Sequence, residues 1–237
     1  MPDAVDLDKL AMVSSPTATH LLLKLGIRNT FLEGIKPLIS GAAVVGRART
    51  LRFLPMREDL SPNPDEPSGN AQRRAIESIV PGEILVVDAG GYLGAGTLGD
   101  ILCERMKYRG ALAVVVDGAV RDSAQIREVG LPVWSKGIHG AASSRSMWPA
   151  DNNVPIRCGG CTVMPGDYII ADEDGVVVIP PTHAAQIAEE GSEAERREEF
   201  IRMKIRDEGY STDCAYPPND EVLAEYESWN KAEATRG

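Results

Sequence analysis

An arginine and an aspartate, Arg121 and Asp122, follow directly after the mostly apolar run of residues 112–120. An arginine can hold a carboxylate through two parallel hydrogen bonds, and an adjacent aspartate can bind Mg²⁺ directly or through its waters. Open parallel sheets bind their ligands beyond the carboxyl ends of the strands, so this position suits a small anion. The same pair can also form a structural ion pair, or Asp122 can cap a short helix. The spacing alone leaves these alternatives open.

A glycine-rich segment, GAGTLG at residues 94–99, matches the G-x-G-x-x-G pattern of dinucleotide sites, and Asp117 lies near the position of a ribose-binding acid. However, the preceding strand is expected to end near Asp88, whereas a dinucleotide site needs the strand to run into the first glycine, Gly94. We therefore expect no nucleotide cofactor. Glycines before a helix leave backbone N–H groups free at the positive end of its dipole, which suits any carboxylate or phosphate.

Cysteine, histidine and lysine give little support to other chemistries. Cys158 and Cys161 form a lone C-x-x-C pair in a strand-rich stretch, without the further ligands of a zinc site or the helix N-terminus of a redox motif. We interpret them as buried thiols. None of the three histidines has a Ser or Cys partner in a recognisable nucleophile elbow. Lys136 ends a predicted strand and could form a Schiff base, but a solvated lysine is far more common.

The elements that must position these residues follow from hydrophobic patterning. Runs rich in Val, Ile and Leu predict buried strands over residues 81–91, 111–120 and 131–137. The segments beside them predict helices over residues 71–79, 98–110 and 122–130. This alternation is typical of a parallel sheet covered on both faces. We also expect a helix over 17–25, a strand over 41–53, a long polar loop over 57–70, and short antiparallel or mixed strands over 155–181.

Charge separates the chain into two parts. The 237 residues include 25 Lys and Arg against 35 Asp and Glu, a net charge of −10. Residues 184–237 carry a net charge of −7, and the preceding residues only −3. We therefore predict a catalytic α/β domain over 1–183, followed by an acidic helix and tail over 184–237. The apolar residues of this helix are too sparse to bury a full face against its own domain, so we expect it to pack on a neighbouring subunit.

Composition excludes several classes of partner. Nucleic-acid binding normally needs a basic face, and an aromatic content of 5% leaves few platforms for stacking bases. No apolar run approaches the roughly 20 residues that span a bilayer. The acidic N-terminus lacks the apolar region of a signal peptide, and four cysteines do not form a disulfide scaffold. We expect a cytoplasmic protein with no nucleic-acid and no membrane partner.

Five segments resemble a known family: GDILCERMKYRG, VVVDGAVRD, LPVW, PGD and DEDGVVVIP. They look like the class II pyruvate aldolases typified by 4-hydroxy-4-methyl-2-oxoglutarate aldolase, a family that also includes the RraA-like regulators of ribonuclease E. The resemblance runs from about residue 17 to residue 210, and its most specific part is GDIL followed by DGAVRD. It implies an α-β-β-α sandwich with a mostly parallel central sheet, assembled as a trimer or a dimer of trimers.

The resemblance also implies a site. The family holds the pyruvyl carboxylate with an arginine, which matches Arg121, and its metal-anchoring aspartate matches Asp122. A second acid, which helps to hold a water near the metal, matches Asp100. The backbone amides that complete the carboxylate site match a glycine-led helix start: Gly99, Asp100, Ile101 and Leu102. The implied catalytic residues are Arg121 and Asp100, and the implied cofactor is Mg²⁺ or Mn²⁺.

The expected function is retro-aldol cleavage of a small anionic 4-hydroxy-2-oxo acid to pyruvate and a second carbonyl product. Decarboxylation of oxaloacetate is the expected side activity, because it passes through the same enolate. The alternative is a non-enzymatic RraA-like regulator that binds a ribonuclease, since the Arg-Asp pair occurs in regulators too. The sequence departs from the family where Thr19 and His20 replace a common Ser-Asp pair. Family aldolases also use an acid from a neighbouring subunit, for which Glu33 and the acids of the tail helix are candidates.

Overall fold

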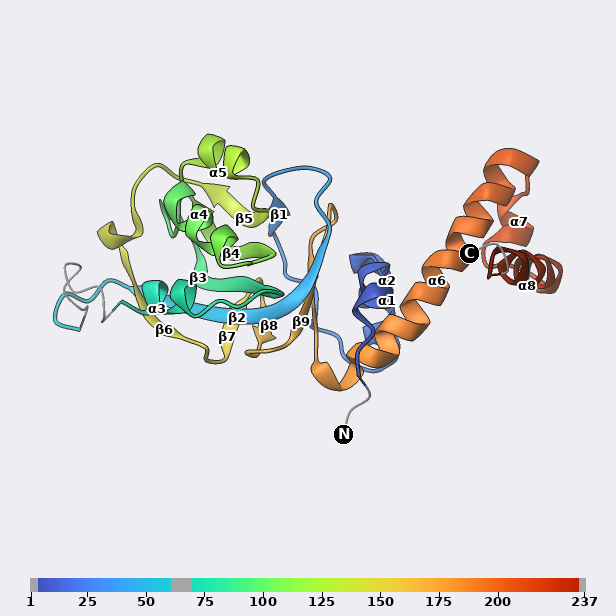
Figure 1. Cartoon of the computed structure of the whole chain (residues 1–237), viewed down its shortest axis with the longest axis horizontal. Helices are drawn as coiled ribbons and strands as arrows, with labels where there is room; N and C mark the ends of the chain where they lie inside the picture. The colour runs from blue at the N-terminus through green and yellow to red at the C-terminus, as the bar shows by residue number, and fades with distance from the viewer. Residues whose placement is uncertain (1–3, 61–69, 235–237) are drawn as a thin grey trace.

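A sheet of eight strands forms the centre of the molecule (Figure 1). The computed structural model describes residues 4–60 and 70–234. Four strands run parallel to one another: β2 (Val44–Pro55), β3 (Glu83–Gly96), β4 (Ala113–Val120) and β5 (Val133–Ile138). The remaining strands pair antiparallel with their neighbours: β1 (Lys36–Pro37), β6 (Met147–Asn152), β9 (Tyr168–Ala171) and β10 (Val176–Ile179). The order is β1-β5-β4-β3-β2-β9-β10, with β6 also pairing β2.

Both faces of the parallel strands are covered. On one face lie three short helices: α3 (Ala71–Glu77), α4 (Asp100–Tyr108) and α5 (Ser123–Val129). On the other face lies a two-stranded hairpin: β7 (Ile156–Cys158) and β8 (Cys161–Val163). Strand β4 is buried along its whole length, and its alternate residues enter different cores. Val114 and Val116 pack with the three helices, whereas Val115 packs with the hairpin, so a continuous apolar run is required there.

The N-terminal helices join the body to a long C-terminal helix, α6 (Pro181–Glu208). Helix α1 (Leu7–Ala11) and helix α2 (Ser15–Lys24) share a third apolar cluster with the start of α6, where Ile187 is fully buried. Helix α2 begins close to its predicted position, because the side chain of Ser14 accepts the N–H of Thr17 and so caps it. These contacts attach the first part of α6 to the sheet.

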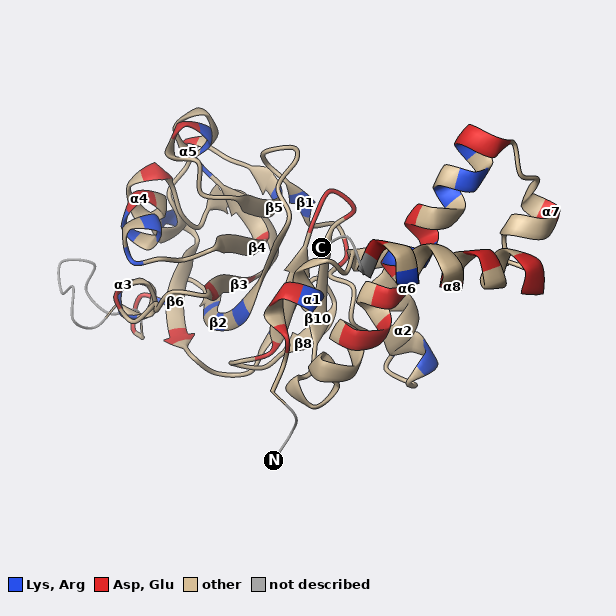
Figure 2. Cartoon of the chain, turned by 45° about the vertical axis from the view of Figure 1, so that its right-hand side comes forward, with Lys and Arg blue, Asp and Glu red and all other residues tan. Residues whose placement is uncertain are grey.

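The second half of α6 leaves the body. It packs against α7 (Thr212–Ala215) and α8 (Asp220–Ala234) in a fourth apolar cluster that contains Phe200 and Tyr226. Figure 1 shows this helical extension projecting away from the sheet. Figure 2 shows acidic and basic residues interspersed along α6. None of the helices in the described residues has the length and hydropathy needed to span a lipid bilayer.

The α/β fold predicted from the sequence is confirmed, with two corrections. The strand predicted over 81–91 does not break at its glycines: Gly90 and Gly91 have φ of 62° and 74°, and β3 continues past them to Gly96 with irregular pairing to β4. The tail helix does bury apolar residues within its own chain, because α1, α2 and α8 supply partners for both halves of α6.

Candidate active site

The start of helix α4 is open to an anion. Its N-cap is Gly99, which has extended backbone (φ −136°) and makes no side-chain cap hydrogen bond. The first N–H groups of a helix have no partner within the helix, and here no capping side chain replaces one. Helix α4 has nine residues, enough for an aligned set of peptide dipoles at this end. The first turn is therefore suited to a carboxylate or phosphate.

Arg121 and Asp122 lie against the same glycine. The backbone N–H of Arg121 donates to the Leu98 carbonyl at 3.0 Å, which ties the end of β4 to the residue before Gly99. Arg121 Nε lies 3.0 Å from Asp122 Oδ2. A Cβ on Gly99 would overlap Asp122 Oδ2 and lie 3.2 Å from Arg121 Nε. The guanidinium, the carboxylate and the open helix end thus meet at one place.

Asp122 adopts an unusual backbone conformation for a residue with a side chain. Its φ of 54° and ψ of 41° lie in the left-handed region, which is uncommon outside glycine although Asp tolerates it better than most residues. Asp122 occupies the N-cap position of α5, yet its side chain makes no capping hydrogen bond. Of the alternatives left open by the sequence, the structure shows the ion pair with Arg121. The Arg121 and Asp122 side chains are 40% and 37% exposed, so a ligand can reach both.

The other residues predicted for this site lie on the first turn of α4. Asp100 is half-buried, and Leu102 packs partly against the core beneath the helix. Ile101 is 76% exposed, so most of its side chain faces solvent. The structure therefore brings together the amides of this turn, Arg121 and Asp122.

The three glycines of GAGTLG have different places. Gly94 and Gly96 lie within strand β3, and only Gly99 precedes the helix. The expected end of the strand near Asp88 is therefore wrong, but the segment still differs from a dinucleotide turn, in which the glycines lie where the strand passes into the helix. A Cβ on Gly96 would lie 2.8 Å from both the backbone N and the Cβ of Arg121. The absence of a side chain at Gly96 lets β3 approach the base of Arg121.

A charged cluster that the sequence did not predict lies on the opposite face of the sheet. Lys136 Nζ lies 2.6 Å from Asp117 Oδ1, and the Asp117 side chain is only 2% exposed. The other oxygen of Asp117 accepts the Gly159 N–H from the β7–β8 turn at 3.0 Å. Lys136 is therefore in a partly buried ion pair, and the expectation of a solvated lysine is wrong. Burial also raises the pKa of Asp88, the register partner of Asp117 on β3.

The cysteines are buried thiols, as predicted. Cys158 and Cys161 are neighbours across the β7–β8 hairpin, and both are buried and free. Burial raises the pKa of the Cys158 thiol well above its ordinary value and that of Cys161 to about 11. Within the part of the chain that the structure describes, no group of three or more His, Cys, Asp or Glu side chains is arranged to hold a metal ion.

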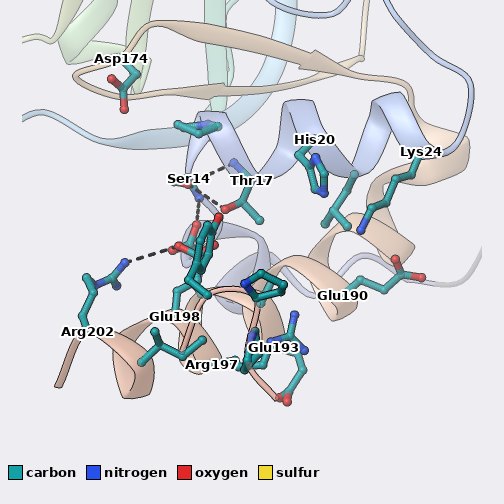
Figure 3. Close-up of a pocket in the computed structure, with 18 residues that line it drawn as sticks. Ser14, Thr17, His20, Lys24, Asp174, Glu190, Glu193, Arg197, Glu198 and Arg202 are labelled. Atoms are coloured by element: carbon teal, nitrogen blue, oxygen red, sulfur yellow. Dashed lines mark hydrogen bonds and ion pairs between the residues drawn. The ribbon is translucent and has the colours of Figure 1, made fainter. Parts of the chain in front are cut away.

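A cleft of about 1080 Å³ lies elsewhere, between α2, α6 and residues 216–218 (Figure 3). Its lining includes His20, but neither Arg121 nor Asp122. One tail acid, Glu195, is engaged there, because its Oε1 accepts the Ser14 N–H at 3.0 Å. Burial disfavours the charge on Glu195, but hydrogen bonds from Ser14 and Thr17 outweigh it and lower the pKa of the carboxyl.

A family model covers most of the body just described. The model for RraA-like proteins, described as Aldolase/RraA, matches residues 3–178, well over half of the chain. The chain belongs to the RraA-like family. The match ends within β10, before α6, so it contains every residue of the site at Gly99 and Arg121 and none of the C-terminal helices.

The names of the relatives point in two directions within the RraA-like family. A 4-hydroxy-4-methyl-2-oxoglutarate aldolase of Thermus thermophilus is 34% identical over 59% of this chain and 77% of its own length. The solved structure of Streptomyces coelicolor RraAS2, described as an unusual member of the RNase ES inhibitor RraA family, is 40% identical with a TM-score of 0.76 over 83% of this chain and 94% of that chain. Protein DlpA of Legionella pneumophila is 30% identical, over 84% of this chain but only 31% of DlpA. The aldolase names support an aldolase activity at the level of the family.

Proposed function

We propose that this protein is a divalent-metal-dependent aldolase that cleaves a 4-hydroxy-2-oxo acid to pyruvate and a second carbonyl product. The observation that carries the proposal is the meeting of Arg121, Asp122 and the uncapped start of α4 at Gly99. A cation, a carboxylate and a row of free amides around one glycine fit a small 2-oxo acid better than a nucleotide or a polymer. The aldolase names among the relatives support the same reaction class.

The substrate carboxylate would lie between the Arg121 guanidinium and the first-turn amides from Gly99 to Leu102. An arginine can hold a carboxylate through two hydrogen bonds, and the helix start adds donors that need no rearrangement. Both features orient the 2-oxo group toward Asp122. They also place positive charge where negative charge develops during the reaction.

The donor set at Asp122 fits a magnesium or manganese ion. Mg²⁺ usually keeps several waters and takes only one or two protein carboxylates together with substrate oxygens, so a single half-exposed carboxylate is sufficient. Asp122 would hold the ion, and the ion would supply a Lewis acid for the 2-oxo oxygen. No nucleotide cofactor is needed for this chemistry.

The side chains of Arg121 and Asp100 would stabilise the charge and transfer the protons of the reaction. In retro-aldol cleavage the C4 hydroxyl would pass its proton to a water held by Asp100, the C3–C4 bond would break, and the electron pair of that bond would pass into the enolate of pyruvate. Arg121 would stabilise that charge. Asp100, on the first turn of α4, would hold the water through which C3 regains a proton. Loss of carbon dioxide from oxaloacetate yields the same enolate, so we propose it as a side activity.

The site is completed in our proposal by assembly into a homotrimer or a dimer of trimers. Arg121 and Asp122 are open to solvent in the single chain, and Glu33 is exposed on the loop before β1. A neighbouring subunit would cover the open side and provide an acid to the distal part of the substrate. The partners proposed are thus a small anionic 2-oxo acid and further copies of this chain.

The test is pyruvate release from oxaloacetate and from a panel of 4-hydroxy-2-oxo acids, with Mg²⁺ and with EDTA. We expect EDTA-sensitive turnover, and we expect Arg121→Ala to lower it by about a hundredfold or more. Arg28→Ala, which removes an exposed arginine, is the matched control. Wild-type rates in Arg121→Ala would show that the site is assigned to the wrong residues.

A second candidate is a regulator that binds a ribonuclease without turnover, and the description of the Streptomyces relative favours it. The two candidates differ in the assay above. Absence of EDTA-sensitive turnover on every 2-oxo acid in the panel, together with binding to a purified ribonuclease E-type enzyme, would favour the regulator. Turnover abolished by EDTA would favour the aldolase.

A further inference from the structure

Gln72 occupies a buried position on a helix face that is otherwise apolar. Gln72 is the second residue of α3 and is only 9% exposed, on the helix face that also buries Ala75 and Ile76. Its side-chain Nε2 donates to the backbone carbonyl of Thr97 at 2.7 Å. A buried amide needs such a partner, so this contact fixes where the side chain points. It joins α3 to the segment between β3 and α4.

That segment is tied on its other side to the end of β4. The N–H of Thr97 donates to the Ala119 carbonyl at 2.9 Å, and the Thr97 hydroxyl donates to the same oxygen at 3.2 Å. The Leu98 carbonyl accepts the N–H of Arg121 at 3.0 Å. Residues 97–98 are thus held between α3 and β4, directly before the open start of α4 at Gly99.

We infer that Gln72 is a positioning residue for the anion site. It holds the Thr97 carbonyl, and through that peptide it sets the direction in which the amides after Gly99 face relative to Arg121. A small displacement of a group that binds or stabilises a reacting anion greatly lowers the reaction rate. The same displacement changes the free energy of unfolding much less. This inference rests on the proposed function for its catalytic meaning, but the positioning itself is a property of the free protein.

The central test replaces the donor by an apolar group of similar length. Gln72→Met leaves the Thr97 carbonyl without its partner, and Gln125→Met, on the exposed side of α5, is the matched control. The probe is oxalate, a planar analogue of the pyruvate enolate, titrated in the presence of Mg²⁺ by calorimetry. We expect Kd for oxalate and KM for oxaloacetate to rise about tenfold in Gln72→Met, with both unchanged in Gln125→Met. Unchanged Kd in a folded Gln72→Met protein would overturn the inference.

A second variant separates positioning from simple destabilisation. In Gln72→Glu a protonated carboxyl can donate to the Thr97 carbonyl, whereas a charged carboxylate repels it, and burial raises the pKa of such a group. Oxalate affinity relative to wild type should therefore recover as the pH falls from 8 toward about 5.5. Gln72→Met should show no such recovery. The same relative affinity for both variants at every pH would show that the hydrogen bond has no part in binding.

Hydrogen exchange keeps the test independent of the proposed function. The backbone amides of Thr97, Cys103 and Arg121 donate to the carbonyls of Ala119, Gly99 and Leu98. Without any ligand, these three amides should exchange faster in Gln72→Met than in the wild type or in Gln125→Met. Faster exchange in Gln72→Met, combined with a wild-type protein that binds no oxalate, would contradict the proposed function and support the positioning role. Unchanged exchange would overturn the positioning role whether or not oxalate binds.

Discussion

At the residue scale, Gly99 is the position where a single added methyl group should disturb the proposed site. A Cβ there would overlap the Asp122 carboxylate and crowd Arg121 Nε, so an alanine must displace at least one charged group. We expect Gly99→Ala to lower kcat/KM for oxaloacetate by more than about tenfold and to weaken oxalate binding to a similar degree. Steady-state kinetics and calorimetry measure both effects.

The matched control for this substitution is Gly140→Ala. A Cβ on Gly140 meets no atom within 4 Å, and its φ lies outside the left-handed region, so the added methyl group is tolerated. This variant should keep wild-type affinity and activity. Equal behaviour of the two alanine variants would mean that Gly99, Arg121 and Asp122 do not share a ligand.

The buried thiols make a prediction about reactivity. Because burial raises the pKa of Cys158 and Cys161, the latter to about 11, both are thiols and poor nucleophiles near neutral pH. Cys214 is only partly buried. We expect iodoacetamide at about pH 8 to label Cys214 first, and the hairpin cysteines only after denaturation. Peptide mass spectrometry would show it, and equal labelling of Cys158 in the native protein would disprove it.

The places of the site residues at the ends of elements could be predicted from the sequence. Arg121 and Asp122 come directly after a buried strand, and Gly99 comes directly before a helix, so neighbouring strands bring them together. The pair between Lys136 and Asp117 was not predictable, because it depends on the alignment of β5 with β4 and on the hairpin that buries it. Sequence shows which residues end an element, but not which interior residues meet across elements.

At the scale of elements, a glycine can end a strand or mark an irregularity within it, and the sequence does not distinguish the two. Gly90 and Gly91 look like the end of a strand, yet their positive φ values support an irregularity within β3. The apolar residues of α6 were judged too few to bury a face, because the sequence does not show that α1, α2 and α8 pack against them. Helix α1 has five residues, too few for a hydrophobic period to be recognised, and it is one of the elements that cover Ile187.

The attachment of α6 to α2 gives a pH-dependent prediction. The pKa of Glu195 is lowered in the folded protein, so its contacts contribute stability above the ordinary carboxyl pKa, and this contribution is lost as the pH falls through the lowered value. Glu195→Gln should therefore lower Tm at pH 7, and the difference from wild type should shrink as the pH falls below the ordinary glutamate pKa of about 4.3. Differential scanning calorimetry at several pH values measures this.

A neighbouring acid on the same helix serves as the control. Glu199 is exposed, and its side chain forms no hydrogen bond or ion pair among the described residues. Glu199→Gln should leave Tm within experimental error of wild type at each pH. A constant loss of Tm in Glu195→Gln from pH 3 to 7 would indicate that packing, and not the charge, holds the two helices together.

At the scale of the whole molecule, the part of the acidic tail from Phe200 onward has its own apolar cluster and compensates part of its own charge. Lys204 lies 2.8 Å from carboxylate oxygens of both Glu208 and Glu225, which raises the pKa of the lysine above its ordinary value. The rings of Phe200 and Trp229 are 5.4 Å apart in the apolar cluster beneath these groups. The family match ends at residue 178, before this cluster, so the role of the tail needs a test of its own.

Truncation after Glu199 tests whether that addition is assembly. It removes the whole cluster around Phe200, Tyr226 and Trp229, and it keeps Ile187, which anchors the first part of α6 on the body. If the tail joins subunits, as expected from the sequence, the truncated chain keeps a cooperative thermal unfolding transition but contains fewer subunits by light scattering. Its turnover of oxaloacetate should fall at the same time, because the proposed site is completed by a neighbour. A truncated protein with the wild-type number of subunits and the wild-type rate would place the tail outside both assembly and catalysis.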